Sequence, residues 1–412
     1  MKILAVALAD EAQRFVRGYP PKGARLLLRP DIEICRLATL RGGEDQFFYL
    51  DQRVEPVEPS AEFDLILARC HFGQEENARW LVAEFARLNQ PVILFGPAVT
   101  AWGRNPPHWA IHRVKGDITS VFDEIRADAL YRQLKPLYES SYQPRYVVPQ
   151  YGLGKRPVMN TNYQPVQFVK GCACPEPFRH LCSEFLYYRD RTLLRRKDEI
   201  VGEILSLPGK HLHLLDEDIT RFPDYYDALF KLLWNYHRHW SVNAGDALFN
   251  YPDFIHLLAK AGTKIIFLND TFLTFRLKTA LKSKELTKQL YRRVKFLQAR
   301  RILVGAKITI SINEKNFNEI ATLLSRIDLD FVEIRFTSIG PDGKEQLLSL
   351  SYHPMLKSVD PLWVKNRFYA LGALIDRFLR RPRRVGFYST VAYLIPYSLA
   401  YRQNFLEGLT YP

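Results

Sequence analysis

The chain has 412 residues, 47% of them hydrophobic, and a formal net charge of +14 at pH 7. This length suggests two or three domains, and the hydrophobic content excludes a disordered protein. The apolar run at residues 1–8 ends at Asp10 and Glu11 without a cleavage site, which indicates a buried strand and not a signal peptide. No stretch approaches the roughly 18 apolar residues of a membrane span, so we expect a cytoplasmic protein.

Basic residues cluster at 189–197, 292–301 and 377–384. Such runs are usually solvated helix faces, and the abundant tyrosines and phenylalanines form no base-stacking motif. The charge alone does not identify a partner, and we do not expect nucleic acid to be one.

Strands and helices alternate along residues 1–135. Predicted strands cover 2–8, 32–40, 63–68, 91–95 and 111–114, and predicted helices cover 75–88 and 120–131. This alternation predicts a Rossmann-like domain, an α/β fold with a parallel sheet and crossover helices. Ligands bind beyond the carboxyl ends of such strands. The candidate cofactor-binding rim therefore consists of Lys22, Gly23, His71, Phe72, Gly96, Pro97, Gly116 and Asp117.

Residues 136–164 hold prolines spaced among tyrosines and predict an extended linker. A second alternating series fills 165–340. Its predicted strands cover 166–169, 211–215, 239–242, 264–268, 306–311 and 331–337, and its predicted helices cover 197–207, 224–236, 251–261, 284–301 and 316–327. Six such units predict a partial (β/α)6 barrel with functional groups at the strand ends. Residues 341–412 are expected to form a helical C-terminal segment.

Three of the five cysteines, Cys172, Cys174 and Cys182, fall within eleven residues after the first strand of this second series. Soft thiolate ligands favour zinc, copper(I) or an iron–sulfur cluster. His180 lies two residues before Cys182, and three cysteines with one histidine would complete a structural zinc site. Three thiolates alone would leave one iron of a cluster open. Cys35 and Cys70 lie in apolar stretches and are expected to be inert core residues.

Five short stretches carry a family resemblance. They are Pro20-Pro21-Lys22-Gly23, Phe95-Gly96-Pro97-Ala98, Val114-Lys115-Gly116-Asp117, Lys170-Gly171-Cys172 and Leu214-Leu215-Asp216-Glu217-Asp218. Each is similar to a motif of the cobalamin-binding-domain radical S-adenosylmethionine family. The chain departs from that family in two places. Its cysteines are spaced Cys172-x-Cys174-x7-Cys182 where the usual motif is Cys-x-x-x-Cys-x-x-Cys, and it lacks the Asp-x-His-x-x-Gly motif that supplies a histidine ligand to cobalamin.

The resemblance implies a radical-SAM-type barrel with a 4Fe–4S cluster on the three clustered cysteines, bound S-adenosylmethionine, and cobalamin as a further candidate cofactor. It implies an enzyme that generates a deoxyadenosyl radical for methyl transfer or for C–C or ring chemistry on a small-molecule or peptide substrate. The implied partner is an electron donor such as flavodoxin or ferredoxin. By their position at barrel strand ends, the candidate adenosylmethionine contacts are Asp216, Asp218, Asn243, Asn269, Thr309 and Ser311.

Two other interpretations use the same residues. A zinc-stapled basic binding protein would use Cys172, Cys174, His180 and Cys182 structurally and its arginines for phosphate contacts. A non-catalytic family member would keep the fold without the cluster. The acidic residues 216–218 also have a local interpretation, as caps of the following helix. Neighbouring carboxylates repel one another unless a cation is near, and adenosylmethionine is such a cation.

Overall fold

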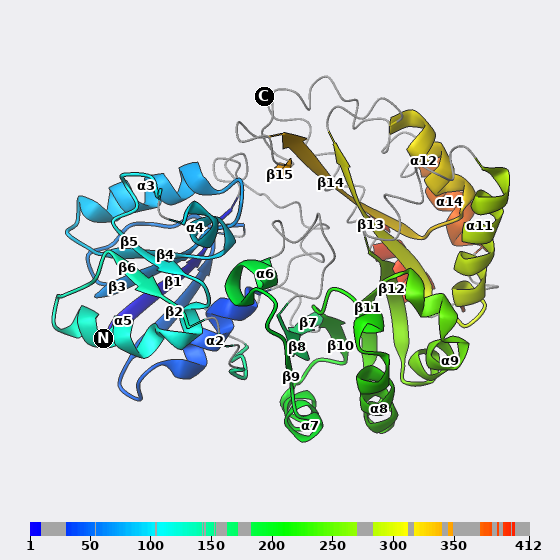
Figure 1. Cartoon of the computed structure of the whole chain (residues 1–412), viewed down its shortest axis with the longest axis horizontal. Coiled ribbons are helices and arrows are strands. Elements are labelled where there is room, and N and C mark those ends of the chain that lie inside the picture. Colours follow the sequence, from blue (N-terminus) through cyan, green and yellow to red (C-terminus); the bar gives the residue numbers. More distant parts are fainter. Residues whose placement is uncertain are drawn as a thin grey trace. The chain divides into compact units, whose positions relative to one another are not determined.

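The computed structural model describes residues 1–9, 30–53, 55–103, 105–141, 143, 146–151, 153, 163–171, 183–269, 283–311, 317–339, 345–348, 371–380, 385–386, 390–396 and 398–399. These residues form two compact units (Figure 1). The first unit holds the described residues up to 153 together with 169–171 and 183–195. The second unit holds 163–168 and the described residues from 196 onward.

The first unit is built on a six-stranded, wholly parallel sheet. Its strands are β1 (Lys2–Ala7), β2 (Gln46–Asp51), β3 (Leu65–Arg69), β4 (Val92–Phe95), β5 (His112–Lys115) and β6 (Leu137–Glu139), in the order β2-β1-β3-β4-β5-β6. Its helices are α2 (Ile32–Leu40), α3 (Glu75–Ala86), α4 (Pro97–Trp102), the short 3-10 turn η2 (Ile118–Ser120), α5 (Phe122–Leu130) and α6 (Ser183–Tyr188). A small antiparallel ribbon joins β8 (Val169–Lys170) to β9 (Leu193–Leu194).

Helices cover both faces of this sheet, and strand β1, which lies between β2 and β3, is apolar on both sides. Leu4, Val6 and Leu8 pack with Leu81 and Phe85 of α3. On the other face, the alternate residues of β1, which are Ile3, Ala5 and Ala7, pack against two helices. The helix side chains are Ile34 and Leu37 of α2 and Phe122 and Ile125 of α5. A strand buried on both faces has a nearly continuous apolar sequence, as β1 does.

The prediction of a strand at residues 32–40 is wrong, because these residues form helix α2. Asp31 caps this helix by accepting hydrogen bonds from the backbone N–H groups of Glu33 and Ile34. Most of α2 is buried, so it has no wide polar face, and its apolar run has no clear helical period. The edge strands β2 and β6 were not predicted.

The described residues of the second unit form a sheet of six parallel strands and one antiparallel strand. They are β7 (Tyr163–Val166), β10 (His211–Leu214), β11 (His239–Ala244), β12 (Thr263–Leu268), β13 (Leu303–Ser311), β14 (Phe331–Ile339) and β15 (Glu345–Leu348), paired in that order. Strand β15 runs antiparallel to β14. The helices are α7 (Lys197–Ser206), η4 (Ile219–Arg221), α8 (Pro223–Leu233), η5 (Trp234–Tyr236), η6 (Asp246–Asn250), α9 (Pro252–Lys260), α11 (Lys284–Gln298), α12 (Phe317–Arg326), α14 (Leu371–Arg380) and η8 (Thr390–Leu394).

The helices between these strands bury one apolar stripe each. In α8 the buried positions are Tyr226, Leu229, Phe230 and Leu233, which is the spacing of one helix face. The same pattern recurs in α9 and α11. The structure thus confirms the predicted α/β class, with a Rossmann-like parallel sheet followed by a second parallel sheet. The C-terminal segment, predicted to be helical, also supplies strand β15.

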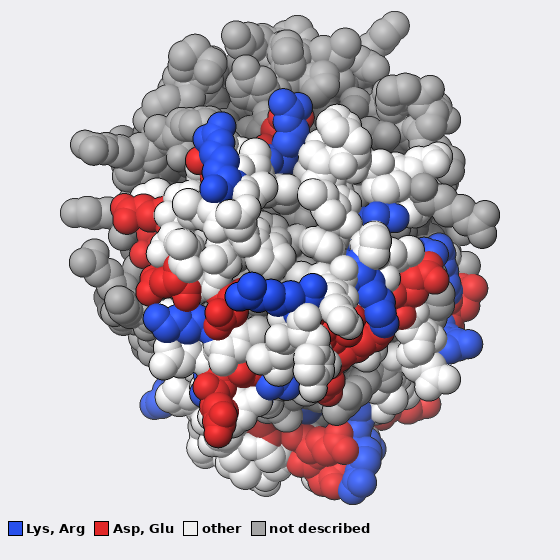
Figure 2. All heavy atoms as spheres, turned by 90° about the vertical axis from the view of Figure 1, so that its left-hand side faces the viewer, with Lys and Arg blue, Asp and Glu red and all other residues white. Residues whose placement is uncertain are grey.

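The surface charge of the first unit is mixed. Figure 2 shows lysine and arginine side chains interspersed with aspartate and glutamate side chains over the described surface of one face. Several charged side chains of the first unit pair, such as Lys115 with Glu139 at 2.7 Å. None of the described helices combines the length and the hydrophobicity of a membrane span.

Candidate functional site

The chain that leads out of β7 is tied to the end of β10 through Asp216. Both carboxylate oxygens of Asp216 accept a hydrogen bond from the Phe168 backbone N–H at 3.1 Å, and the Tyr226 hydroxyl donates to Oδ2 at 2.6 Å. The Asp216 side chain is buried. Its carboxylate therefore fixes Phe168, which stands four residues before Cys172 in the sequence.

Asp218 caps the short helix η4. Its Oδ1 atom accepts hydrogen bonds from the Thr220 backbone N–H at 2.9 Å, the Thr220 hydroxyl at 2.6 Å and the Gly245 N–H at 2.8 Å. A Cβ on Gly245 would lie 2.4 Å from Asp218 Oδ2, so only glycine allows this approach. Asp218 thus joins the loops that follow β10 and β11, which agrees with the local interpretation of the acidic residues as caps.

Two buried asparagines on neighbouring strands hold the loop after β10. Asn243, in β11, donates its Nδ2 protons to the carbonyl oxygens of Leu214 at 3.1 Å and Asp216 at 3.0 Å. Asn269, directly after β12, donates to the Glu217 carbonyl oxygen at 3.1 Å. These bonds orient both amides and place their side-chain oxygens at the same edge of the sheet.

Those side-chain oxygens are acceptors with no donor among the described residues. Within that part of the chain, Oδ1 of Asn243 and Oδ1 of Asn269 are both buried and accept no hydrogen bond, and the two residues are 1% and 7% exposed. A buried acceptor without a donor costs about 1–3 kcal/mol. A ligand that brings N–H or O–H groups to this edge would remove that penalty.

Of the remaining predicted site residues, two are placed by their backbone only, and several others lie outside the described residues. Thr309 and Ser311 are at the carboxyl end of β13, in register with Arg335 and Thr337 of β14. Outside the described residues are Lys22, Gly23, Cys172, Cys174, His180 and Cys182. Within the part of the chain that the structure describes, no three His, Cys, Asp or Glu side chains are grouped to hold a metal ion. The cluster ligands stay a prediction.

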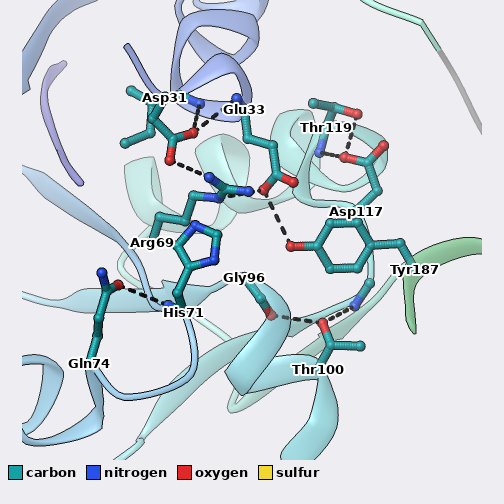
Figure 3. A network of polar contacts seen from close by, with 12 residues as sticks. Asp31, Glu33, Arg69, His71, Gln74, Gly96, Thr100, Asp117, Thr119 and Tyr187 are labelled. Carbon is teal, nitrogen blue, oxygen red and sulfur yellow. Dashed lines mark hydrogen bonds and ion pairs between the residues drawn. The ribbon is translucent and has the colours of Figure 1, made fainter. Parts of the chain in front are cut away.

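Two rim glycines of the first sheet, Gly96 and Gly116, permit close packing, and Figure 3 shows Gly96 beside Thr100. Gly96 follows β4 with φ of 117°, and a Cβ on it would lie 2.5 Å from the Cys70 carbonyl oxygen. Gly116 follows β5 with φ of 97°, and its Cβ would lie 2.6 Å from Ser140 Cβ. The Thr100 hydroxyl links the two turns, because it donates to the Gly96 carbonyl and accepts from the Gly116 N–H, both at 3.0 Å.

A buried ion-pair network lies beside these turns (Figure 3). Arg69, the last residue of β3, pairs with Asp31 and with Glu33. Oε2 of Glu33 lies 3.0 Å from Nε of Arg69 and accepts a hydrogen bond from the Tyr187 hydroxyl at 3.4 Å. Burial favours a raised pKa for Asp31, but the charge of Arg69 outweighs it and the pKa is lowered. For Glu33, burial with the charges of Asp31 and Asp117 outweighs Arg69, so the pKa is raised.

Asp117 and Lys170 form a second buried pair. The Lys170 ammonium donates to Asp117 Oδ2 at 2.9 Å and to the Tyr188 hydroxyl at 3.0 Å, and the Tyr188 hydroxyl also donates to Asp117. Burial opposes ionisation of Asp117, but Lys170 and these hydrogen bonds lower its pKa to about 2. Burial and the charge of Arg36 lower the pKa of Lys170, against the attraction of Asp117.

The structure brings the described rim candidates to one end of the first sheet. Pro97 begins α4 and is buried, and Phe72 packs against Leu186, Tyr187 and Tyr188 of α6. Sequence reasoning missed the charged and aromatic partners that surround these candidates, namely Asp31, Glu33, Arg69, Lys170, Tyr187 and Tyr188. Lys170 gave one local signal, since it interrupts the apolar run that precedes Gly171 and Cys172.

We expect the first unit to lose stability in acid because of His71. Burial and the charge of Arg69, with Arg53, lower the pKa of His71 to about 3 against the charge of Asp31. The ordinary value of 6.5 applies to the unfolded chain, so the unfolded state binds the proton first and the free energy of unfolding falls as the pH drops from 6.5 towards 3. We expect His71→Gln to remove roughly 1–2 kcal/mol of that loss between about pH 6.5 and 4.5, after allowance for the part-exposed ring.

Urea unfolding at a series of pH values measures this effect. The exposed His108 supplies a matched control, and His108→Gln should follow the wild-type curve. Asp117 contributes only below its ordinary value of 3.8, outside this window. If the free energy of unfolding of His71→Gln depended on pH as that of wild type does, the pKa of His71 would not be lowered in the folded protein.

No protein-family model matches the chain, and no curated protein matches it. Solved structures do match its fold. The radical S-adenosylmethionine methyltransferase TsrM from Kitasatospora setae, with tryptophan substrate and an adenosylmethionine analogue bound, matches at a TM-score of 0.55 and 14% identity, over 82% of this chain and 73% of TsrM. TsrM with cobalamin and a 4Fe–4S cluster bound matches at 0.54 and 13% identity, over 82% and 72%.

The cobalamin-dependent S-adenosylmethionine radical enzyme OxsB gives a TM-score of 0.48 at 11% identity, over 89% of this chain and 56% of OxsB. At the identities seen with TsrM, the similarity establishes a shared fold. The fold of this chain therefore resembles that of a cobalamin-binding radical adenosylmethionine enzyme.

Proposed function

We propose that this chain is a radical S-adenosylmethionine enzyme that acts on a small molecule or a peptide. The observation that carries the proposal is the pair of buried Oδ1 atoms of Asn243 and Asn269, which find no donor among the described residues. Both lie at strand ends where the sequence predicts adenosylmethionine contacts. The fold shared with TsrM and the three closely spaced cysteines support it.

A 4Fe–4S cluster held by Cys172, Cys174 and Cys182 would supply the electron that cleaves adenosylmethionine, delivered by a donor such as flavodoxin or ferredoxin. The described residues bind and orient the ligand. The two asparagine oxygens accept hydrogen bonds from ammonium or hydroxyl groups, and Thr309 and Ser311 are proposed to contact the ribose. Asp216 and Asp218 are proposed to shape the loop after β10 around the ligand, since protein groups already engage both carboxylates and Arg221 lies 3.5 Å from Asp218.

The described rim of the first sheet does not fit a corrin. At Gly96 and Gly116, protein atoms occupy the space that a side chain would need, and the Asp117 carboxylate is bonded to Lys170 and Tyr188. Phe72 is packed against α6. No buried side-chain nitrogen or oxygen among the described residues 69–73, 96–97 and 116–117 lacks a partner. The proposed chemistry therefore contains no cobalamin step.

Metal and sulfide analysis of anaerobically purified protein tests the proposal. We expect about four irons and four sulfides per chain, because three thiolates hold a 4Fe–4S cluster with one iron open to the ligand. Replacing Cys172, Cys174 and Cys182 together by alanine should abolish both. Zinc at about one per chain would instead indicate the structural site formed with His180, and protein without metal would indicate a non-catalytic scaffold.

The two other cysteines described by the structure supply the matched control. Cys35 and Cys70 are buried in the first unit, and burial raises the pKa of both thiols, so neither is a ready metal ligand. The variant Cys35→Ala/Cys70→Ala should keep the full iron content. Loss of iron from this variant would contradict the assignment of the three ligands.

A further inference from the structure

Both ends of the cysteine-bearing segment are held in the first unit. The segment lies between Gly171 and Ser183. On its amino side, Val169 and Lys170 pair with Leu194 and Leu193 in the β8–β9 ribbon. On its carboxyl side it runs directly into α6.

A hydrogen bond connects two residues that flank this segment, Gly171 and Glu184, which we call its base. The Gly171 N–H donates to Glu184 Oε2 at 2.8 Å and so joins the two ends across 13 residues. Gly171 has φ of 95°, and a Cβ there would lie 2.1 Å from the Arg191 carbonyl oxygen. The residue before Cys172 therefore has to be a glycine in this conformation.

Lys170 is the most buried charge at this base, with 1% of its surface exposed. Lysine is almost never fully buried unless it is paired. Here its ammonium is bonded to Asp117, at the end of β5, and to Tyr188, at the end of α6. One buried triad thus connects the first sheet to both ends of the cysteine-bearing segment.

Stability alone does not account for an ion pair at this place. A buried pair contributes little compared with apolar residues of the same size, because desolvation offsets the attraction. A buried, paired lysine fixes the orientation of its own side chain and backbone, because its ammonium has to lie beside one particular carboxylate. Tyr187 gives α6 a second fixed point through Glu33, and Phe72 packs against both tyrosines.

We infer that the Lys170–Asp117–Tyr188 triad is a positioning device, by which the first unit sets where the cysteine-bearing segment begins and ends. The inference rests on the proposed function, because the segment matters as the carrier of the cluster ligands. It gives the first unit a role of its own that does not require a bound corrin.

The rate at which a chelator removes iron from the protein tests the inference. The double variant Lys170→Met/Asp117→Asn removes the ion pair without leaving one charge buried alone, and the introduced amide oxygen can still accept the cap bond from the Thr119 N–H. Residues that orient metal ligands typically change metal affinity by about 10- to 100-fold. We therefore expect iron release about tenfold faster than in wild type, with a changed cluster spectrum.

Two further variants keep the result interpretable. Tyr188→Phe removes one hydroxyl from the triad and should show the same direction of change if the double variant does not fold. Lys115→Met/Glu139→Gln removes the exposed ion pair between β5 and β6 and should release iron at the wild-type rate.

The outcomes separate this inference from the proposed function. Wild-type protein that binds zinc or no metal overturns both. Wild-type protein with a cluster, and folded triad variants that release iron at the wild-type rate with an unchanged spectrum, overturn the positioning role alone. Equal acceleration in the control variant would also overturn it, because the effect would then be one of general stability.

Discussion

Replacing Asp216 by alanine is expected to destabilise the second unit by roughly 3–5 kcal/mol, because a buried carboxylate that accepts several hydrogen bonds would be lost. The Phe168 N–H and the Tyr226 hydroxyl would both lose their acceptor. Burial, and then the negative charge of Asp216, raise the pKa of Tyr226, so its hydroxyl stays a donor. The loss should also release Phe168, and with it the chain that enters the cysteine-bearing segment.

Chemical denaturation followed by circular dichroism measures the change. Asp216→Asn should be milder, since an amide oxygen still accepts one of these bonds. Asp224 lies in the first turn of α8 and is exposed, so Asp224→Ala is the control and should change stability by less than about 1 kcal/mol. An Asp216→Ala curve that superimposes on the wild-type curve would show that this carboxylate is not structural.

Removing the asparagine oxygens is expected to weaken adenosylmethionine binding. In cluster-loaded protein, Asn243→Ala and Asn269→Ala should each raise the Kd by about ten- to a hundredfold. The physical reason is that each Oδ1 is buried, has no donor among the residues that the structure describes, and gains one from the ligand. The effect should be larger for the double variant.

Anaerobic calorimetry with adenosylmethionine measures these affinities. Tyr393→Phe is the control, because Tyr393 bonds His211 at 2.5 Å and His239 at 2.6 Å, at the opposite ends of β10 and β11. That variant removes polar contacts from the same strands and should leave the affinity unchanged. Asparagine variants that keep the wild-type affinity would remove this pair from the ligand site.

The sequence alone determined most elements of the second unit, since helix and strand periods are local. The expected helix 251–261 corresponds to Pro252–Lys260, and the expected strand 264–268 corresponds to Thr263–Leu268. The same reasoning failed at Ile32–Leu40, where tertiary burial on several sides removes the polar face that marks a helix. The edge strands β2 and β6 are short or half exposed and give a weak apolar pattern.

Part of the candidate site was also determined by the sequence. Parallel strands end at a common edge, so Asp216, Asn243 and Asn269 could be assigned to one end of the second sheet from their positions alone. The cysteine spacing predicts a ligand set, and that set stays a prediction because Cys172, Cys174 and Cys182 lie outside the described residues. Periodicity carries no information, however, on which oxygen of an amide lacks a donor.

The buried charges were decided by tertiary structure alone. Lys170 and Asp117 are 53 positions apart, and Tyr187 and Glu33 are 154 positions apart. A charge is stable in the interior only beside its partner, and long-range packing selects that partner. The sequence therefore determined that a lysine precedes the cysteines, and the fold decided that Asp117 and Tyr188 hold it there.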